Sequence, residues 1–411
     1  MSLLIALIKI AVVIGGLMTA AAYFVLLERR IAAWIQDRHG PNRVGIPLTR
    51  IRLLGLGQPL ADGLKMLFKE EYTPAHVDRP LFLLAPVTIM AASLAVFAVI
   101  PVGSVLPAMP GLGIEQPLEL VIAPGLDVGM LYVFAVSSIA VYGVILGGWA
   151  SNNKYSFLGA LRSSAQLIAY ELPLGLAILG AVLAAGTLRL DGIITHQAQT
   201  GIWLALSQPL GFVVFTVAAF AEAGRLPFDL PECEQELVGG YHTEYAGMKL
   251  VLFLTAEFIH MITASCLIVI LFLGGWHFWG LTGAGQQVGW GLALVRVGVL
   301  MVKVVAVILF FMLVRWTWPR FRFDQLMSLA WKIMLPLGVV NLVAVAAVGE
   351  WTHAAAGGQL GALGARTTLL ACLAGWLVAI AAWTAVALSG PEVSDNRPRL
   401  DLRRYEIDPQ R

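Results

Sequence analysis

Long apolar runs separated by short polar segments dominate the pattern along the chain. A helix needs about 20 mainly apolar residues to cross the hydrocarbon core of a bilayer. Nine runs are close to this length, and they cover residues 4–27, 80–101, 128–149, 165–186, 204–222, 247–273, 297–314, 330–348 and 367–388. Because lipid satisfies no backbone hydrogen bond, such runs are expected to be helices. The pattern therefore predicts an all-α, polytopic transmembrane helical protein with about nine spans.

One polar segment has a helical pattern of its own. In residues 58–70, apolar side chains recur on one helical face and charged side chains occupy much of the remainder. The apolar side chains are Leu60, Leu64, Leu67 and Phe68, and the charged ones are Asp62, Lys65 and Lys69. This pattern predicts an amphipathic helix at the membrane surface. An ordinary surface helix that only anchors its loop fits the pattern equally well.

Lys and Arg are distributed unevenly between the two sides of the predicted membrane. Loop 28–79 carries nine of them and loop 102–127 carries none, and this alternation continues to the tail after residue 388, which carries five. By the positive-inside rule, the N-terminus is expected outside and the C-terminus in the cytoplasm. The inner loops 28–79 and 220–245 then share the cytoplasmic side.

Composition agrees with a membrane protein and excludes several other classes. Of the 411 residues, 59% are hydrophobic and 13% are charged, against about 25% charged in soluble proteins. The net charge of +2 gives no basic field for nucleic acid. The first apolar run has neither a basic segment before it nor a small-residue cleavage site after it, so it is expected to be a retained span rather than a signal peptide.

The sequence contains no recognisable site for a metal, a nucleotide or a redox cofactor. Cys233, Cys266 and Cys372 lie in separate segments and form no CxxC pair. There is no GxGxxG motif after a strand and no GxxxxGK[ST] motif. We therefore expect no metal and no cofactor bound by this chain, and any electron carriers are expected on other subunits.

Residues 220–245 hold the strongest functional signal, because they contain six of the 25 acids and a single base, Arg225. The acids are Glu222, Asp229, Glu232, Glu234, Glu236 and Glu244. A structural interpretation explains part of this set: Asp229 can cap a helix, Pro231 suits its first turn, and acids there favour the helix dipole. It explains Glu236 and Glu244 poorly.

Several charged residues fall within the apolar runs themselves, where burying a charge is costly and ionisable groups usually have a function. Glu171 lies two residues before Pro173, Glu222 ends the fifth run, and Glu257 lies well within the sixth. Carboxylates connected by water can pass protons when burial moves their pKa towards neutrality. Lys303, in the seventh run, is either part of such a path or the structural partner of one acid.

Other polar residues near the spans have structural interpretations. Glu28 and Arg29 follow the first run and are expected to reach the membrane boundary together. His242 and His260 are expected to be hydrogen-bonded structural groups, because no acid–histidine spacing around them predicts a metal site.

These segments together resemble one family, the membrane component of the proton-pumping NADH:quinone oxidoreductase (respiratory complex I) that is called the H subunit, or subunit 1 in mitochondria. The main match is the signature loop at residues 222–245, EAGRLPFDLPECEQELVGGYHTEY. Further matches, in family order, are residues 38–45 (RHGPNRVG), 58–65 (QPLADGLK), 148–155 (GWASNNKY), 159–166 (GALRSSAQ), 170–171 (YE) and 320–326 (RFRFDQL).

The resemblance implies a subunit that joins the membrane arm to the peripheral arm and forms much of the quinone chamber. Quinone would be the substrate, and NADH, FMN and iron–sulfur clusters would be bound by partner subunits. The implied partners are the peripheral-arm iron–sulfur and quinone-site subunits, the antiporter-like membrane subunits and membrane lipids. The implied location is the cell inner (plasma) membrane.

The resemblance also implies roles for particular residues. The residues implied to face the quinone are Arg225, Phe228, Asp229, Glu232 and Glu234. The quinone tail would enter between the first and sixth spans and the surface helix, near Arg29, Arg38, Asp62, Lys65 and Lys69. The implied proton path from the quinone cavity towards the antiporter-like subunits is Glu171, Glu222, Glu257 and Lys303.

The chain departs from the family pattern in two places. Ala223 and Gly224 stand where the family usually has Thr-Asn, so side-chain hydrogen bonds are lost and the backbone is freer. The family core commonly has eight spans, which suggests a division into a core at 1–348, an extra ninth helix with its preceding outer loop at 349–390, and a polar cytoplasmic tail at 391–411. The extra helix could pack beside a neighbouring subunit or lipid.

Three other functions stay open on the sequence alone. One is the anchor subunit of a related membrane-bound hydrogenase or of a ferredoxin- or F420-linked complex. Another is a stand-alone ion transporter, although no inverted repeat of the kind common in secondary transporters is visible. The third is a purely structural anchor, in which the buried acids would be dispensable.

Overall fold

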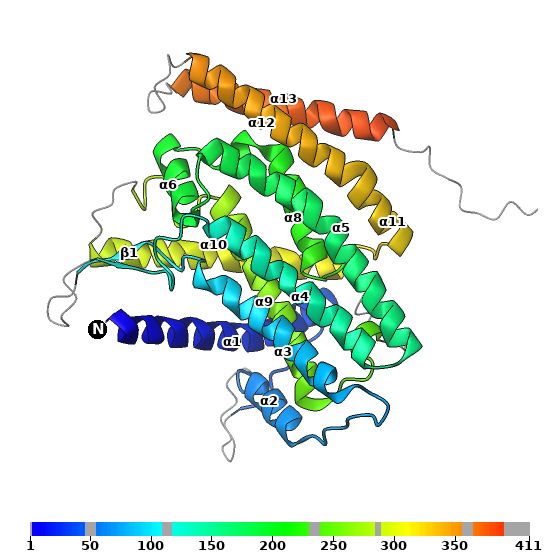
Figure 1. Ribbon diagram of the computed structural model, residues 1–411. Helices are drawn as coiled ribbons and strands as arrows, with labels where there is room; N and C mark the ends of the chain where they lie inside the picture. Colours follow the sequence, from blue (N-terminus) through cyan, green and yellow to red (C-terminus); the bar gives the residue numbers. More distant parts are fainter. Residues whose placement is uncertain are drawn as a thin grey trace, which may run out of the picture.

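The computed structural model describes residues 2–45, 55–108, 117–229, 239–283, 289–355 and 365–389. Most of the described residues lie in helices (Figure 1). They are α1 (Ser2–Ile35), α2 (Gln58–Phe68), α3 (Arg79–Ala95), α4 (Gly129–Ala150), α5 (Lys154–Ala185), α6 (Leu190–Thr200), α7 (Leu204–Ser207), α8 (Pro209–Glu222), α9 (Gly247–Phe272), α10 (Trp290–Thr317), α11 (Phe323–Ser328), α12 (Leu335–Ala355) and α13 (Ala365–Ser389). Short helical turns cover Val96–Ala98, Gly240–His242 and Leu329–Met334, and the two-residue strands β1 (Val105–Leu106) and β2 (Leu118–Glu119) pair antiparallel.

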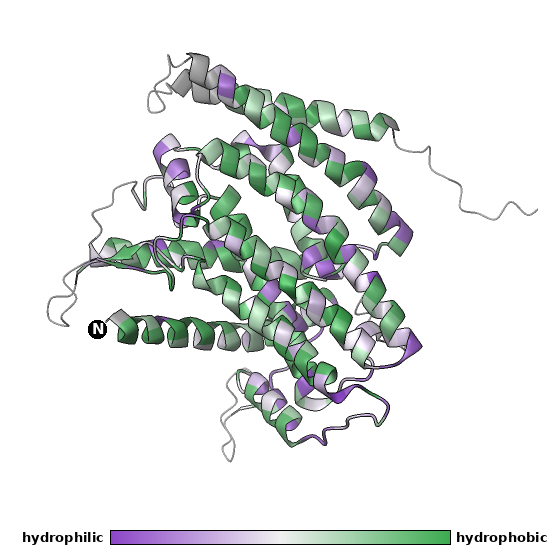
Figure 2. Ribbon diagram, viewed as in Figure 1, coloured by the Kyte–Doolittle hydropathy of each residue, from purple (hydrophilic) through white to green (hydrophobic). Residues whose placement is uncertain are grey.

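Eight helices in the described residues are long and apolar enough to cross a membrane, which confirms an all-α, polytopic membrane protein. Hydrophobic residues predominate along these helices (Figure 2). The fifth apolar run, 204–222, folds differently: α7 and α8 are separated at Gln208, and α8 has only 14 residues. Pro209 has no N–H to continue the hydrogen-bond ladder from α7, which explains why the helix restarts there.

Helix boundaries differ from the predicted runs where polar residues fold as helix. Helix α1 continues through Glu28 to Ile35. Helix α5 begins at Lys154, eleven residues before the predicted span, because the Asn153 side chain caps it by accepting a hydrogen bond from the Tyr155 N–H at 3.0 Å. Helix α6 was not predicted, since its mixed composition gives no long apolar run. The predicted surface helix is present as α2, and none of its residues is buried.

Helix α9 forms the centre of the bundle. Buried positions make up 72% of its most apolar stretch, the highest share among the eight long helices. It packs against α3, α10, α1 and α8. Helix α13 lies on the other side of α8, against α12, α7 and α8, at the top of Figure 1. The acids on α5, α8 and α9 are therefore carried by helices that pack together in the interior.

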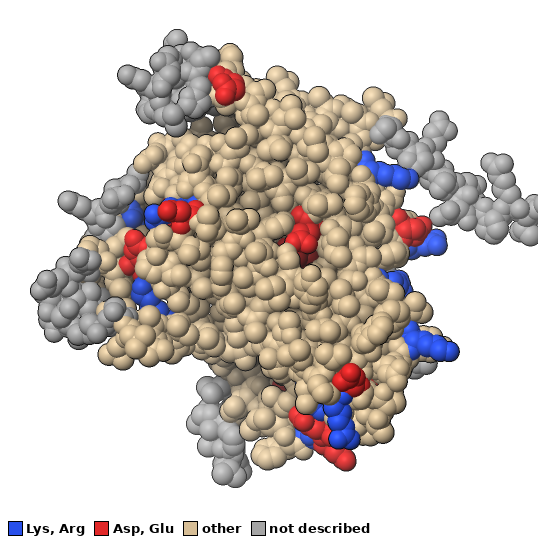
Figure 3. Space-filling model, viewed as in Figure 1, with Lys and Arg blue, Asp and Glu red and all other residues tan. Residues whose placement is uncertain are grey.

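Charged side chains are sparse on the face shown in Figure 3. Lys and Arg lie mainly towards the edges, and one group of acidic atoms is visible in the middle of the otherwise uncharged surface. This distribution is expected for a protein surrounded by lipid, where charge is kept to the ends of the spans. The predicted division at residues 348 and 390 stays a prediction, and residues 391–411 lie outside the described residues.

Candidate functional site

A buried ion-pair cluster lies where the signature loop leaves α8. The Arg225 Nε lies 2.7 Å from Oε1 of Glu257 on α9, and its Nη1 lies 3.2 Å from Oε2 of Glu28 on α1. The exposed fractions of these three side chains are 5%, 11% and 9%. Arg315 at the end of α10 also pairs with Glu28. These contacts bring opposite charges together in a region where either sign alone would be costly.

Asp229 extends this cluster towards residues 230–238. Its carboxylate lies 3.5 Å from Nη2 of Arg320, and its side chain is buried. Burial is the main cause that raises the pKa of Asp229 to about 7, and the negative charge of Glu257 adds to it. The positive charges of Arg315, Arg320 and Arg225 act in the opposite direction. A carboxyl group with this pKa can gain or lose a proton near neutral pH.

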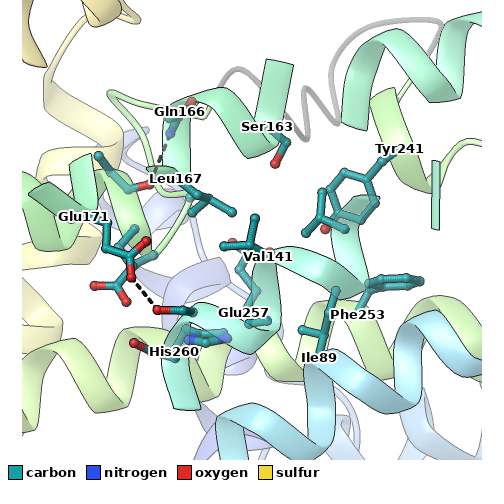
Figure 4. Close-up of a pocket in the computed structure, with 18 residues that line it drawn as sticks. Ile89, Val141, Ser163, Gln166, Leu167, Glu171, Tyr241, Phe253, Glu257 and His260 are labelled. Atoms are coloured by element: carbon teal, nitrogen blue, oxygen red, sulfur yellow. Dashed lines mark hydrogen bonds between the residues drawn. The ribbon is translucent and has the colours of Figure 1, made fainter. Parts of the chain in front are cut away.

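Next to the cluster, acids from three helices line one cavity. They are Glu171 of α5, Glu222 of α8 and Glu257 of α9. The polar residues Ser137, Ser138, Ser163, Gln166, Tyr241 and His260 also line it. The Ser138 hydroxyl donates a hydrogen bond to Glu171 (Figure 4). The cavity volume is about 80 Å³, and about 10–15 Å³ suffices for one water, so several waters fit between the acids.

A second, smaller cavity of about 10 Å³ adjoins the first. The two share four lining residues: Ser137, Glu222, Ala223 and His260. On its far side the smaller cavity is mostly apolar, with Met130 and Leu267 among its lining residues. Glu222 and His260 therefore stand at the junction of the two spaces.

Phe228 positions the start of the signature loop. Its side chain is buried, 5.5 Å from the ring of Phe321 and 5.4 Å from that of Tyr170. The Gln166 side chain on α5 donates hydrogen bonds to the carbonyls of Phe228, at 2.8 Å, and Ala221, at 3.1 Å. These contacts hold both ends of the segment that carries Arg225.

The residues expected at a quinone entrance lie on or near α2. The Arg29 Nη1 is 2.7 Å from Asp62, which joins α1 to α2, and both side chains are partly exposed. Lys65 on α2 and Arg38 after α1 are also exposed. Glu232 and Glu234 lie outside the described residues.

Lys303 is not brought together with the acids. Its Nζ donates hydrogen bonds to the carbonyls of Leu273 at 2.6 Å, Gly275 at 3.0 Å and His277 at 2.6 Å, and it lies 4.4 Å from the ring of Trp203. It therefore caps the C-terminal end of α9, where free carbonyls favour a cation. A part for Lys303 in proton transfer stays a prediction.

Glu28 and Arg315 belong to the cluster, although the sequence pattern predicted a boundary position for Glu28 and marked no role for Arg315. The expectation that Glu28 reaches the membrane boundary is wrong, because the residue is 7% exposed and holds two arginines. One signal was available: apolar residues continue to Ile35, which places Glu28 inside a longer helix. Among the described residues, no group of three or more His, Cys, Asp or Glu side chains could hold a metal ion.

Comparison with known proteins gives a consistent result over most of the chain. The NADH dehydrogenase family model matches residues 8–346. An NADH-quinone oxidoreductase H subunit of Geobacter metallireducens is 48% identical over 335 residues, which cover 82% of this chain and 93% of the relative. The H subunits of Leptospira biflexa and Flavobacterium johnsoniae are 46% identical over 338 residues and 43% identical over 342 residues; the alignments cover 81% and 83% of this chain and 91% and 94% of the relatives.

Proposed function

The chain belongs to the family of the NADH-quinone oxidoreductase H subunit, a membrane component of respiratory complex I, and from this we propose that it forms much of the quinone chamber and couples quinone reduction to proton translocation. The multi-pass chain is thus a subunit of an enzyme complex. In the proposed arrangement, NADH, FMN and iron–sulfur clusters are held by partner subunits, and quinone is the substrate that reaches this chain.

The observation that carries the coupling proposal is the meeting of Glu171, Glu222 and Glu257 in one cavity. They come from three different helices, so nothing in local structure requires them to be close. Water between carboxyl groups lets a proton move by short transfers that need no large motion of the chain. The space of about 80 Å³ suits this use, whereas ligand pockets are usually about 300–1,000 Å³. The quinone ring is accordingly expected outside this cavity, in a chamber completed by partner subunits.

Arg225 links the proposed quinone side to the acids. Its guanidinium bonds Glu257, which lines the cavity, and Asp229 lies four residues further along the loop. The charges of Asp229 and Glu257 influence each other. A change of charge as quinone is reduced near Asp229 would therefore alter the proton affinity of Glu257. The remaining residues of the proposed quinone face are Phe228, Glu232 and Glu234.

The proposed quinone entrance lies beside α2, which contacts both α1 and α9. Its apolar side chains Leu60, Leu64, Leu67 and Phe68 are exposed, so an apolar quinone tail could pass along them without leaving an apolar surface. The Arg29–Asp62 bridge, Arg38 and Lys65 would provide polar contacts at the rim. With the basic loops on the cytoplasmic side, the N-terminus would lie outside and the C-terminus in the cytoplasm.

The proposal is tested with Glu171→Gln and Glu257→Gln in the purified complex, reconstituted in vesicles. Each change removes a titratable proton and keeps the side chain's shape. We expect lower NADH:quinone turnover and proton pumping in both variants, with unchanged electron transfer to a water-soluble acceptor that bypasses quinone. Glu350→Gln, at an exposed position on α12, is the matched control. Normal quinone reduction and pumping in both variants would refute the proton path.

Partners are tested by purification in mild detergent. Recovery of the chain with iron–sulfur and antiporter-like subunits and with inhibitor-sensitive NADH:quinone reductase activity is the expected result. Recovery with hydrogenase subunits, or of the chain alone, would contradict the proposed assembly.

A further inference from the structure

His260 lies between two cavities that contain acidic side chains. It lines both the larger cavity, which contains Glu171 and Glu257, and the smaller one beyond it. Of the four residues that the two cavities share, only Glu222 and His260 exchange protons readily. In the larger cavity, His260 lies together with Glu222 and Glu257, so the ring can exchange protons with either acid through water.

The helix geometry places His260 directly beside the acids. It follows Glu257 by three residues on α9, so the two side chains lie on the same helical face, and Figure 4 shows both at the cavity. The charged groups that face it from the packed elements are Glu257 on its own helix, Glu171 from α5 and Glu222 from α8. Arg225 pairs with Glu257 in this group.

The imidazole has no direct hydrogen bond to another described residue. The ring lines both cavities, and the larger one has room for several waters. Neutral histidine carries a donor on one nitrogen and an acceptor on the other, so it can take up a proton at one side and release one at the other.

We propose that His260 is a relay residue that carries protons between Glu257 and Glu222. The inference rests on the proposed function of the buried acids. A proton leaves the Glu257 carboxyl group and reaches one ring nitrogen through water, which gives an imidazolium. The proton on the other nitrogen then passes to the Glu222 carboxylate. The ring is left neutral in its other tautomer, and it is reset when the protons redistribute before the next transfer.

The test is His260→Gln in the reconstituted complex, because glutamine keeps a polar side chain of similar reach but does not titrate. Proton translocation and quinone turnover are measured between about pH 5.5 and 8.5. We expect a translocation rate lowered by about tenfold or more at every pH measured, with electron transfer to the water-soluble acceptor unchanged. His196→Gln, on α6 and outside both cavities, is the matched control and should behave as the wild type.

Electron transfer to the water-soluble acceptor reports whether the complex is assembled. If His260→Gln fails to assemble, the smaller His260→Asn is tested with the same measurements. A wild-type translocation rate across this pH range in the assembled variant would overturn the relay role. Glu257→Gln measured alongside separates two failures: if it is impaired while the His260 variant is normal, only the inference on His260 fails. If both are normal, the acidic path fails as well.

Discussion

Arg225→Met removes one guanidinium from two buried carboxylates at once. In the structure, Arg225 bonds Glu257 at 2.7 Å and Glu28 at 3.2 Å, and it lies 4.2 Å from the ring of Phe258. Methionine fills a similar volume with a neutral, flexible side chain. The substitution therefore tests charge compensation with little change in packing.

The expected destabilisation follows from the burial of all three partners. Their side chains are 5–11% exposed, so water does little to replace the lost cation. Removing one partner of a buried ion pair costs about 3–5 kcal/mol, and a desolvated cation–π contact such as that with Phe258 contributes about 2 kcal/mol more. Because domains are stable by only about 5–15 kcal/mol, Arg225→Met should lower the stability of this subunit measurably. Glu28 retains Arg315, which limits the loss.

The assay is the temperature at which half of the purified complex loses this subunit, followed on native gels. The double variant Arg225→Met/Glu257→Gln removes a carboxylate charge together with the cation, so most of the lost stability should return. The expected order of midpoints is wild type, then the double variant, then Arg225→Met. A wild-type midpoint for Arg225→Met, or a double variant less stable than the single one, would refute the charge argument.

Three further predictions concern single positions. The pKa of Asp229 is raised from 3.8 to about 7 in the folded protein. Between these values the folded state binds more protons than the unfolded state, so the free energy of unfolding falls as pH rises through this window. Asp229→Asn should therefore show a smaller fall in thermal midpoint between about pH 5 and 8. Lys303→Met should lower the thermal midpoint, because charge-assisted hydrogen bonds worth about 2–3 kcal/mol are lost. The number of protons pumped per electron should not change. A changed ratio would assign Lys303 to the proton path. Gly375→Val should lower the thermal midpoint through a cost of about 1–3 kcal/mol, because a Cβ there would lie 2.2 Å from the Ser207 carbonyl oxygen. Gly298→Val, at a position with open space around it, should lower the midpoint less. Equal midpoints for the two variants would contradict the packing argument.

The positions of the spans along the sequence were predictable, because the hydrophobic pattern that marks a span is local. An apolar run of sufficient length is helical in lipid whatever surrounds it, and α2 followed from its own periodicity. The fifth run shows where this reasoning fails: its composition suited one span, but Pro209 restarts the helix after Gln208. Helix α6 was not predicted because its residues have a mixed composition and form no long apolar run.

Residue type and spacing suffice to predict a helical membrane protein with an acidic loop and with acids inside its apolar runs. Which charges meet depends on how distant helices pack. Glu28 and Arg225 are 197 residues apart in sequence yet form an ion pair, whereas Lys303, which the sequence grouped with the acids, bonds backbone carbonyls instead. The physical reason is that a charge in a low-dielectric interior is stable only beside its partner, and the packing of distant helices places that partner there.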